Sequence, residues 1–258
     1  MFESYKRVLT NLPEYSKNIF RKGYFKWLLG QVKGWSKISY GILAVNFILQ
    51  VYILTTTLMG NPSSALFWGA IFGFVGSNFA MLCVVGIAER SSVQGYAGYI
   101  SGIFIILSAV IAHNYANIVE QLVYIIFLDT FCILDPKWGA NIHAESFKSY
   151  KDWFKYLGFF VVILAVIYYI FSLTNDPNLF WDSLTLALAL TGSLLELNLK
   201  KEQYVVWCLL NLSSICLWFM SMGQGTASPA LFILYILFFA NSLHGMQMWY
   251  KDAKATGK

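Results

Sequence analysis

The sequence predicts an all-α polytopic membrane protein with about eight transmembrane helices, and three observations support this fold class. The chain of 258 residues is 58% hydrophobic and only 12% charged, a balance that water-soluble globules of this size do not normally show. Its apolar residues form eight runs, most of them close to the ~20 residues that a helix needs to cross the hydrocarbon core. All 18 Lys and Arg residues lie between alternate runs or at the two ends.

The segment before the first run, residues 1–35, is basic and amphipathic and lacks the apolar centre of a cleavable signal peptide. We expect it to lie on the cytoplasmic side at the membrane interface, with a flexible basic tail as the alternative. The expected spans are 36–58, 64–88, 92–113, 115–134, 154–173, 178–199, 203–222 and 229–249, and residues 250–258 form a tail.

The distribution of basic residues predicts the topology. Eight helices place both termini and every second loop on one side, and that side receives every Lys and Arg. The loops around Asn61, Asn114, Asn175 and Gln224 contain none. By the positive-inside rule, both termini are expected in the cytoplasm.

Weak internal repetition suggests how the helices are grouped. Phe67-Trp68 recurs as Phe180-Trp181, and Tyr124-Ile125 recurs as Tyr235-Ile236, in corresponding helices. We therefore expect a first three-helix repeat over 64–138, a linker helix over 154–173 and a second repeat over 178–249. The first span, 36–58, is an extra amino-terminal helix. Each repeat has an odd number of helices, so one linker helix between them lets both repeats have the same orientation in the membrane. The result is a 3+1+3 arrangement of parallel repeats.

A polar and aromatic stripe marks the middle helix of the second repeat. Its members recur at steps of four, four, three and four, so they share one face of a helix: Gln203, Trp207, Asn211, Ser214 and Trp218. An aromatic ring one turn from an amide can stack a ligand ring and bind its polar edge, and Trp207 also suits a cationic ring. Structural packing of these aromatic residues is the alternative.

Other polar residues near mid-membrane extend the candidate substrate site, because buried amides in lipid usually face a partner helix or a cavity. Gln121 and Tyr124 repeat the combination of amide and aromatic ring, and the set is completed by Asn78, Ser101 and Asn241. For each amide, a hydrogen bond that only holds helices together is the competing interpretation. Asp129 lies deep in its helix and leaves a proton-coupled mechanism open.

Several classes of function are disfavoured by what the sequence lacks. The four Cys and three His residues do not show metal-ligand spacing, so neither a metal nor another cofactor is expected. No nucleophile motif or phosphate-binding loop occurs, which disfavours an enzyme. The net charge of +5 is spread over short loops and does not indicate nucleic-acid binding. Central spans without Lys or Arg favour a ligand that is uncharged or carries a delocalised positive charge.

The run from Asp182 through Lys200-Lys201-Glu202-Gln203 to Trp207 and Asn211 resembles the carboxy-terminal signature of the Pnu vitamin-transporter family. Weaker similarity extends from Phe67 to Trp249. Tyr204 replaces the usual Trp after Glu-Gln, and Ser101 and Gln121 stand where Asn is common.

This resemblance implies a fold related to the SWEET transporters and uptake of nicotinamide riboside, a vitamin B3 form and NAD precursor. It also implies facilitated diffusion across the bacterial cytoplasmic (inner) membrane, with a cytoplasmic riboside kinase that traps the product. Relatives take up thiamine, riboflavin or deoxynucleosides, and a proton-coupled importer of such a vitamin, nucleoside or sugar is the alternative. A homo-oligomer is compatible with the sequence.

Overall fold

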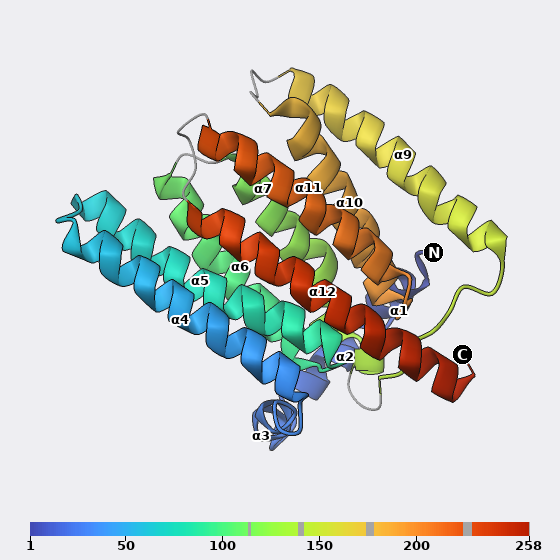
Figure 1. Ribbon diagram of the computed structural model, residues 1–258. Helices are drawn as coiled ribbons and strands as arrows, with labels where there is room; N and C mark the ends of the chain where they lie inside the picture. Colours follow the sequence, from blue (N-terminus) through green and yellow to red (C-terminus); the bar gives the residue numbers. More distant parts are fainter. Residues whose placement is uncertain (113–114, 139–141, 174–177, 224–228, 258) are drawn as a thin grey trace. The chain divides into compact units, whose positions relative to one another are not determined.

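The computed structural model describes residues 1–112, 115–138, 142–173, 178–223 and 229–257 (Figure 1). Within these residues every regular element is a helix. Three short helices come first: α1 (Glu3–Thr10), α2 (Leu12–Ile19) and α3 (Tyr24–Gly30). Long helices follow: α4 (Lys37–Met59), α5 (Ser64–Ala88), α6 (Val93–Ile111), α9 (Tyr150–Ser172), α10 (Leu179–Leu197), α11 (Gln203–Gly223) and α12 (Pro229–Thr256).

The expected fourth span is a composite helix. It begins as α7 (Tyr115–Tyr124), passes through one π-helical turn, η1 (Ile125–Asp129), and ends as α8 (Thr130–Leu134). The Thr130 hydroxyl donates to the Ile125 carbonyl at 2.7 Å, five residues back along this turn. A short 3₁₀ turn, η2 (Pro136–Trp138), follows.

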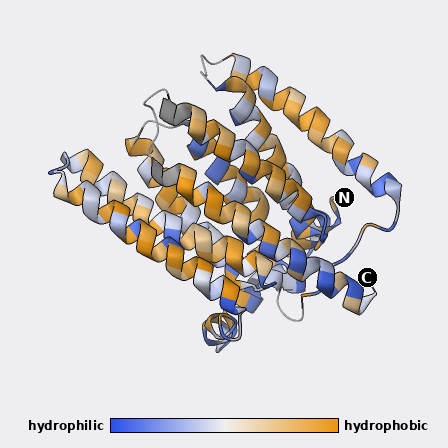
Figure 2. Cartoon of the chain, in the orientation of Figure 1, coloured by the Kyte–Doolittle hydropathy of each residue, from blue (hydrophilic) through white to orange (hydrophobic). Residues whose placement is uncertain are grey.

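Seven spans in the described part of the chain are long and apolar enough to cross a membrane, and they coincide with the first seven expected runs. The eighth run corresponds to α12, which is 28 residues long and continues seven residues beyond the expected end at Trp249. Figure 2 shows hydrophobic residues along the long helices and hydrophilic residues at many of their ends. The expectation of an all-α polytopic membrane protein is therefore confirmed.

The chain divides into two compact units, one of residues 3–142 and one of residues 143–258 together with Met1 and Phe2. In the first unit α4 packs on α5, α5 on α6, and α6 on α7 and η1. In the second unit α9 packs on α10, α10 on α11, and α11 on α12. Each unit thus contains a group of three helices and one additional long helix. That the two groups are repeats of one another stays a prediction.

Burial separates helices with many lipid-accessible residues from those at the core of their unit. Only 11% of the spanning windows of α4 and α9 is buried, whereas 67% of the window of α10 is buried. Large apolar side chains such as Ile48, Val162 and Tyr169 are exposed along α4 and α9. In a protein of this composition such surfaces face lipid, because lipid is as apolar as they are.

The amino-terminal segment folds into three short helices that bond to the rest of the first unit, and its place at the membrane interface stays a prediction. Arg7 forms an ion pair with the buried carboxylate of Asp135. The Tyr5 hydroxyl donates to the Phe127 carbonyl at 2.7 Å. The backbone N–H of Ser92 donates to Oε1 of Gln31 at 2.9 Å.

Candidate functional site

The stripe on α11 lies on the buried side of its helix. Gln203, Asn211 and Ser214 are at most 5% exposed, and Trp207 and Trp218 are half-buried. Residues on another side of α11, among them Leu209 and Phe219, are exposed. The predicted amphipathic pattern of this helix is therefore confirmed, with its polar side facing protein.

Trp207 is held in place by neighbours at two edges of its indole. Its ring N–H donates to Oε1 of Gln203, one turn earlier, at 3.2 Å. Its six-membered ring lies against Gly192 of α10, where an added Cβ would come within 2.9 Å of Cη2 and Cζ3 of the indole. Only a residue without a side chain leaves room for this approach. The ring is thus fixed in orientation while part of its surface remains accessible.

The Gln203 amide has a donor to spare. The residue is completely buried, and its Nε2 has no hydrogen-bond partner among the described residues. A buried amide group left without a partner costs about 1–3 kcal/mol. This unsatisfied donor therefore suits a bound molecule or water beside Trp207.

Asn211 links α11 to α12. Its Nδ2 donates to the hydroxyl of Ser242 at 2.9 Å, so part of the amide does hold two helices together. No hydrogen bond to its Oδ1 is found among the described residues, and this oxygen is not among the fully buried atoms. Asn211 therefore combines a structural bond with an acceptor that a ligand could use. Asn241 is adjacent to Ser242 and is itself 2% exposed.

Trp218 forms a second aromatic pair between the same two helices. Its ring stacks on Tyr235 of α12 with centroids 6.4 Å apart and an interplanar angle of 24°. The buried Nε1 of Trp218 has no hydrogen-bond partner in the described part of the chain. Trp218 and Trp207 lie eleven residues apart on one helix, about 16 Å along its axis.

Two candidates in the first unit are engaged in helix pairing. The Ser101 hydroxyl donates to the Gly76 carbonyl of α5 at 2.9 Å. Asn78 accepts from Nδ2 of Asn46 at 3.2 Å and donates to the Phe74 carbonyl at 2.8 Å. These bonds join α6 to α5 and α5 to α4. A ligand-binding role for Ser101 and Asn78 stays a prediction. A ligand would have to bind their polar groups while these groups also bond to neighbouring helices.

Gln121 and Tyr124 lie just before the π-helical turn. Gln121 donates to Asn117 at 3.4 Å, and the Tyr124 hydroxyl donates to Glu120 at 3.5 Å. Both partners are one turn earlier on the same helix, and both distances are at the long limit for hydrogen bonds. These two hydrogen bonds are therefore weak.

Asp129 closes the π-helical turn and packs against α6. It is 2% exposed, its Oδ2 has no hydrogen-bond partner among the described residues, and its carboxyl group lies directly on Gly98. Gly102, one turn later, makes room for Ile125. The Gly98–Gly102 spacing therefore serves close helix packing.

Three residues near the stripe have roles that the sequence did not reveal. Gly192 makes room for Trp207, and Ser242 is the partner of Asn211. Glu196, next to the end of α10, is completely buried one turn beyond Gly192. The only sequence signal was the run Thr191-Gly192-Ser193, small and polar within an otherwise apolar helix.

Comparison with known proteins identifies the family to which this chain is related. The chain matches the family model described as nicotinamide mononucleotide transporter over residues 70–251. It is 23% identical over 233 residues to the nicotinamide riboside transporter PnuC of Haemophilus influenzae, covering 87% of this chain and 95% of that protein.

A solved structure supports the same fold. The crystal structure of the vitamin B3 transporter PnuC matches with a TM-score of 0.70 and 19% sequence identity, covering 86% of this chain and 94% of that one. The expected resemblance is thereby confirmed, and it points to a membrane transporter rather than an enzyme. With its family model matching most of the sequence, the chain belongs to the nicotinamide mononucleotide transporter family.

Proposed function

We propose that this chain carries nicotinamide riboside into a bacterial cell by facilitated diffusion. The observation that carries the proposal is the arrangement on α11, where a fixed, half-buried indole is combined with a free amide acceptor on Asn211 and an unsatisfied amide donor on Gln203. Nicotinamide riboside presents a cationic aromatic ring, a carboxamide and ribose hydroxyls. Each of these groups has a chemical counterpart in the set.

In this proposal Trp207 stacks on the pyridinium ring, since a cation above an indole face gains about 0.5–2 kcal/mol. Oδ1 of Asn211 accepts a hydrogen bond from the carboxamide. Gln203 and Asn241 bond the remaining polar groups, with Trp218 as a further aromatic surface. Gln121 and Tyr124 of the first unit stay predicted ligand contacts. Alternating exposure of the bound molecule to the two sides of the membrane completes the proposal.

The riboside fits these residues better than its phosphorylated form, although the family is named after the mononucleotide. A phosphate group at mid-membrane needs a cationic or multiple-donor partner, and the spans α5, α6, α10 and α11 contain no Lys or Arg. Phosphorylation by a cytoplasmic kinase would then prevent the product from returning.

A side-by-side binding titration tests the substrate assignment. Purified protein should bind nicotinamide riboside more tightly than nicotinamide mononucleotide, thiamine or riboflavin. Trp207→Ala should weaken riboside binding roughly tenfold through the lost stacking, and Trp207→Phe should restore part of it. Unchanged affinity in Trp207→Ala would overturn the assignment. Preference for thiamine or riboflavin would instead make this a transporter of another vitamin.

A further inference from the structure

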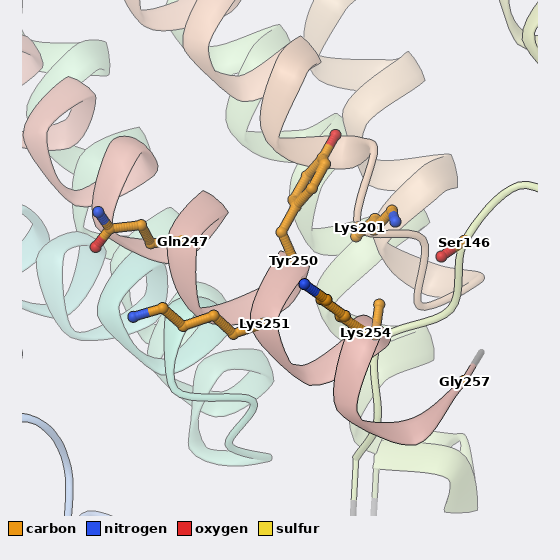
Figure 3. A pocket seen from close by; sticks show the side chains of 8 residues that line it. Ser146, Lys201, Gln247, Tyr250, Lys251, Lys254 and Gly257 are labelled. Atoms are coloured by element: carbon orange, nitrogen blue, oxygen red, sulfur yellow. The ribbon is translucent and has the colours of Figure 1, made fainter.

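A basic pocket lies at the end of α12, away from the polar stripe of α11. Its volume is 630 Å³, and it is lined by Ser146, Lys201, Gln247, Tyr250, Lys251, Ala253, Lys254 and Gly257. Figure 3 shows Tyr250 in the middle, with Gln247 and Lys251 on one side, Lys201 and Ser146 on the other, and Lys254 below. All of these residues belong to the second unit.

Residues 144–147 form a short connecting segment before α9, and this segment bonds to residues around the pocket. Glu145 pairs backbone to backbone with the residues before α11, and its Oε2 accepts from Nζ of Lys200 at 2.9 Å. Asp252 accepts from the backbone N–H of Ala144 at 2.8 Å. Glu202 accepts from the backbone N–H of Phe147 at 3.0 Å. Glu145 of this segment therefore neutralises Lys200, and backbone N–H groups of the segment bond to Asp252 and Glu202.

The lysines that line the pocket are left without a counter-ion. Lys201, Lys251 and Lys254 form no ion pair within the described residues, and Nζ of Lys201 lies 4.8 Å above the ring of Tyr250. Burial, and secondly the charge of Glu202, raise the pKa of the Tyr250 hydroxyl, which therefore stays a hydrogen-bond donor at neutral pH. The two carboxylates that are not paired with a lysine, Asp252 and Glu202, do not balance three ammonium groups, so the pocket attracts anions.

The depth of the pocket identifies the kind of anion. Helix α12 has 28 residues, so it is about 42 Å long, against a hydrocarbon core of about 30 Å. Gln247 and Gly257 lie about 27 and 42 Å from its beginning. The pocket is therefore level with the lipid headgroups, where phosphate is the abundant anion, on the side that the basic residues predict to be cytoplasmic.

We infer that this pocket binds the phosphate of an anionic phospholipid headgroup. Lys201, Lys251 and Lys254 supply the charge, and the hydroxyls of Tyr250 and Ser146 and the amide of Gln247 supply neutral donors. The bound lipid would hold the connecting segment, α11 and α12 together at this end of the second unit. The inference does not depend on which molecule the protein transports.

Lipid binding to the full-length, delipidated protein in nonionic detergent tests the inference. The readouts are retained lipid, counted by native mass spectrometry, and the thermal unfolding midpoint. Phosphatidylglycerol should bind and raise the midpoint, and phosphatidylcholine should not. Because each lysine near a headgroup contributes roughly a fivefold factor, the triple variant Lys201→Gln, Lys251→Gln, Lys254→Gln should bind phosphatidylglycerol more than tenfold more weakly.

The matched control is the triple variant Lys148→Gln, Lys151→Gln, Lys155→Gln. It removes the same charge from exposed positions of the same unit, outside the pocket. It should retain phosphatidylglycerol within about twofold of the unchanged protein, since none of these three lysines lines the pocket. Equal losses in both variants would show general attraction to a basic surface and overturn the inference. Full stabilisation by inorganic phosphate alone would also overturn it, by showing that the ligand is a free phosphate.

Discussion

Asn211 makes one hydrogen bond inside the protein and keeps one oxygen for another partner. Its bond to Ser242 is of the kind that holds transmembrane helices together, worth about 0.6 kcal/mol and at most about 1.7 kcal/mol. The bond between helices uses Nδ2 of Asn211, and the proposed ligand contact uses its Oδ1. Substitutions on the two helices can therefore separate the structural role from the binding role.

Ser242→Ala and Asn211→Ala should differ in ligand binding while sharing the same structural defect. Both remove the bond between α11 and α12, so both should lower the unfolding temperature slightly. Only Asn211→Ala removes the free acceptor, which should weaken riboside binding roughly fivefold, the effect of about 1 kcal/mol. Isothermal titration of both purified variants measures this difference. If Ser242→Ala loses as much affinity, Asn211 acts only by positioning helices.

At the scale of elements, close helix approaches determine where side chains lie. The π-helical turn places the Asp129 carboxyl on the backbone of α6, and this is possible because position 98 is a glycine. Such turns insert an extra residue into a helix and redirect the side chains that follow.

Gly98→Ala should therefore destabilise the first unit. The new methyl group would fall on the Asp129 carboxyl, and overpacking of this kind typically costs 1–3 kcal/mol. The double variant Gly98→Ala, Asp129→Ala should recover much of the loss, because it removes the clashing group. Thermal unfolding in detergent measures both effects.

Gly158→Ala is the matched control for this substitution, since Gly158 lies inside α9 and an added Cβ there meets nothing within 4 Å. It should leave the unfolding midpoint unchanged or raise it slightly, because alanine favours helix. A similar loss in Gly158→Ala and Gly98→Ala would contradict the clash with Asp129.

The helices were largely predictable because hydropathy and charged edges define them. The expected start of α5 at Ser64 and of α11 at Gln203 agrees with the structure. The π-helical turn was not predictable, because its sequence is as apolar as any α-helical turn. Nor was the extension of α12 beyond Trp249, where a hydrogen bond from the backbone N–H of the distant residue Ala144 to Asp252 helps to fix a polar helix end.

The candidate site was predictable as a set of residue types and less so as a set of bonds. The four-residue spacing of Gln203, Trp207 and Asn211 identified the buried side of α11. Spacing along one helix cannot show which neighbour a side chain meets. The roles of Gly192 and Ser242 depend on contacts between helices and became visible only in the structure.

At the scale of the whole molecule, the distribution of charge predicts that both termini are cytoplasmic. A carboxy-terminal fusion to green fluorescent protein should fluoresce, because that protein folds in the cytoplasm and not after export through the general secretion pathway. Alkaline phosphatase fused after Asn61, in a loop without Lys or Arg, should be active outside. The opposite pattern would invert the topology and move the basic pocket of α12 to the outer surface.

Energetic coupling is the remaining property of the whole transporter, and Asp129 is the residue on which a proton-coupled mechanism would depend. Its carboxyl is 2% exposed and packed on the backbone of α6, so proton exchange with water would require the first unit to open. We therefore expect liposomes without a membrane potential to equilibrate labelled riboside equally well with and without a pH gradient. Asp129→Asn, which preserves the shape of the side chain, should transport at a similar rate. Accumulation above equilibrium that needs an acidic exterior and disappears in Asp129→Asn would instead establish a proton-coupled importer.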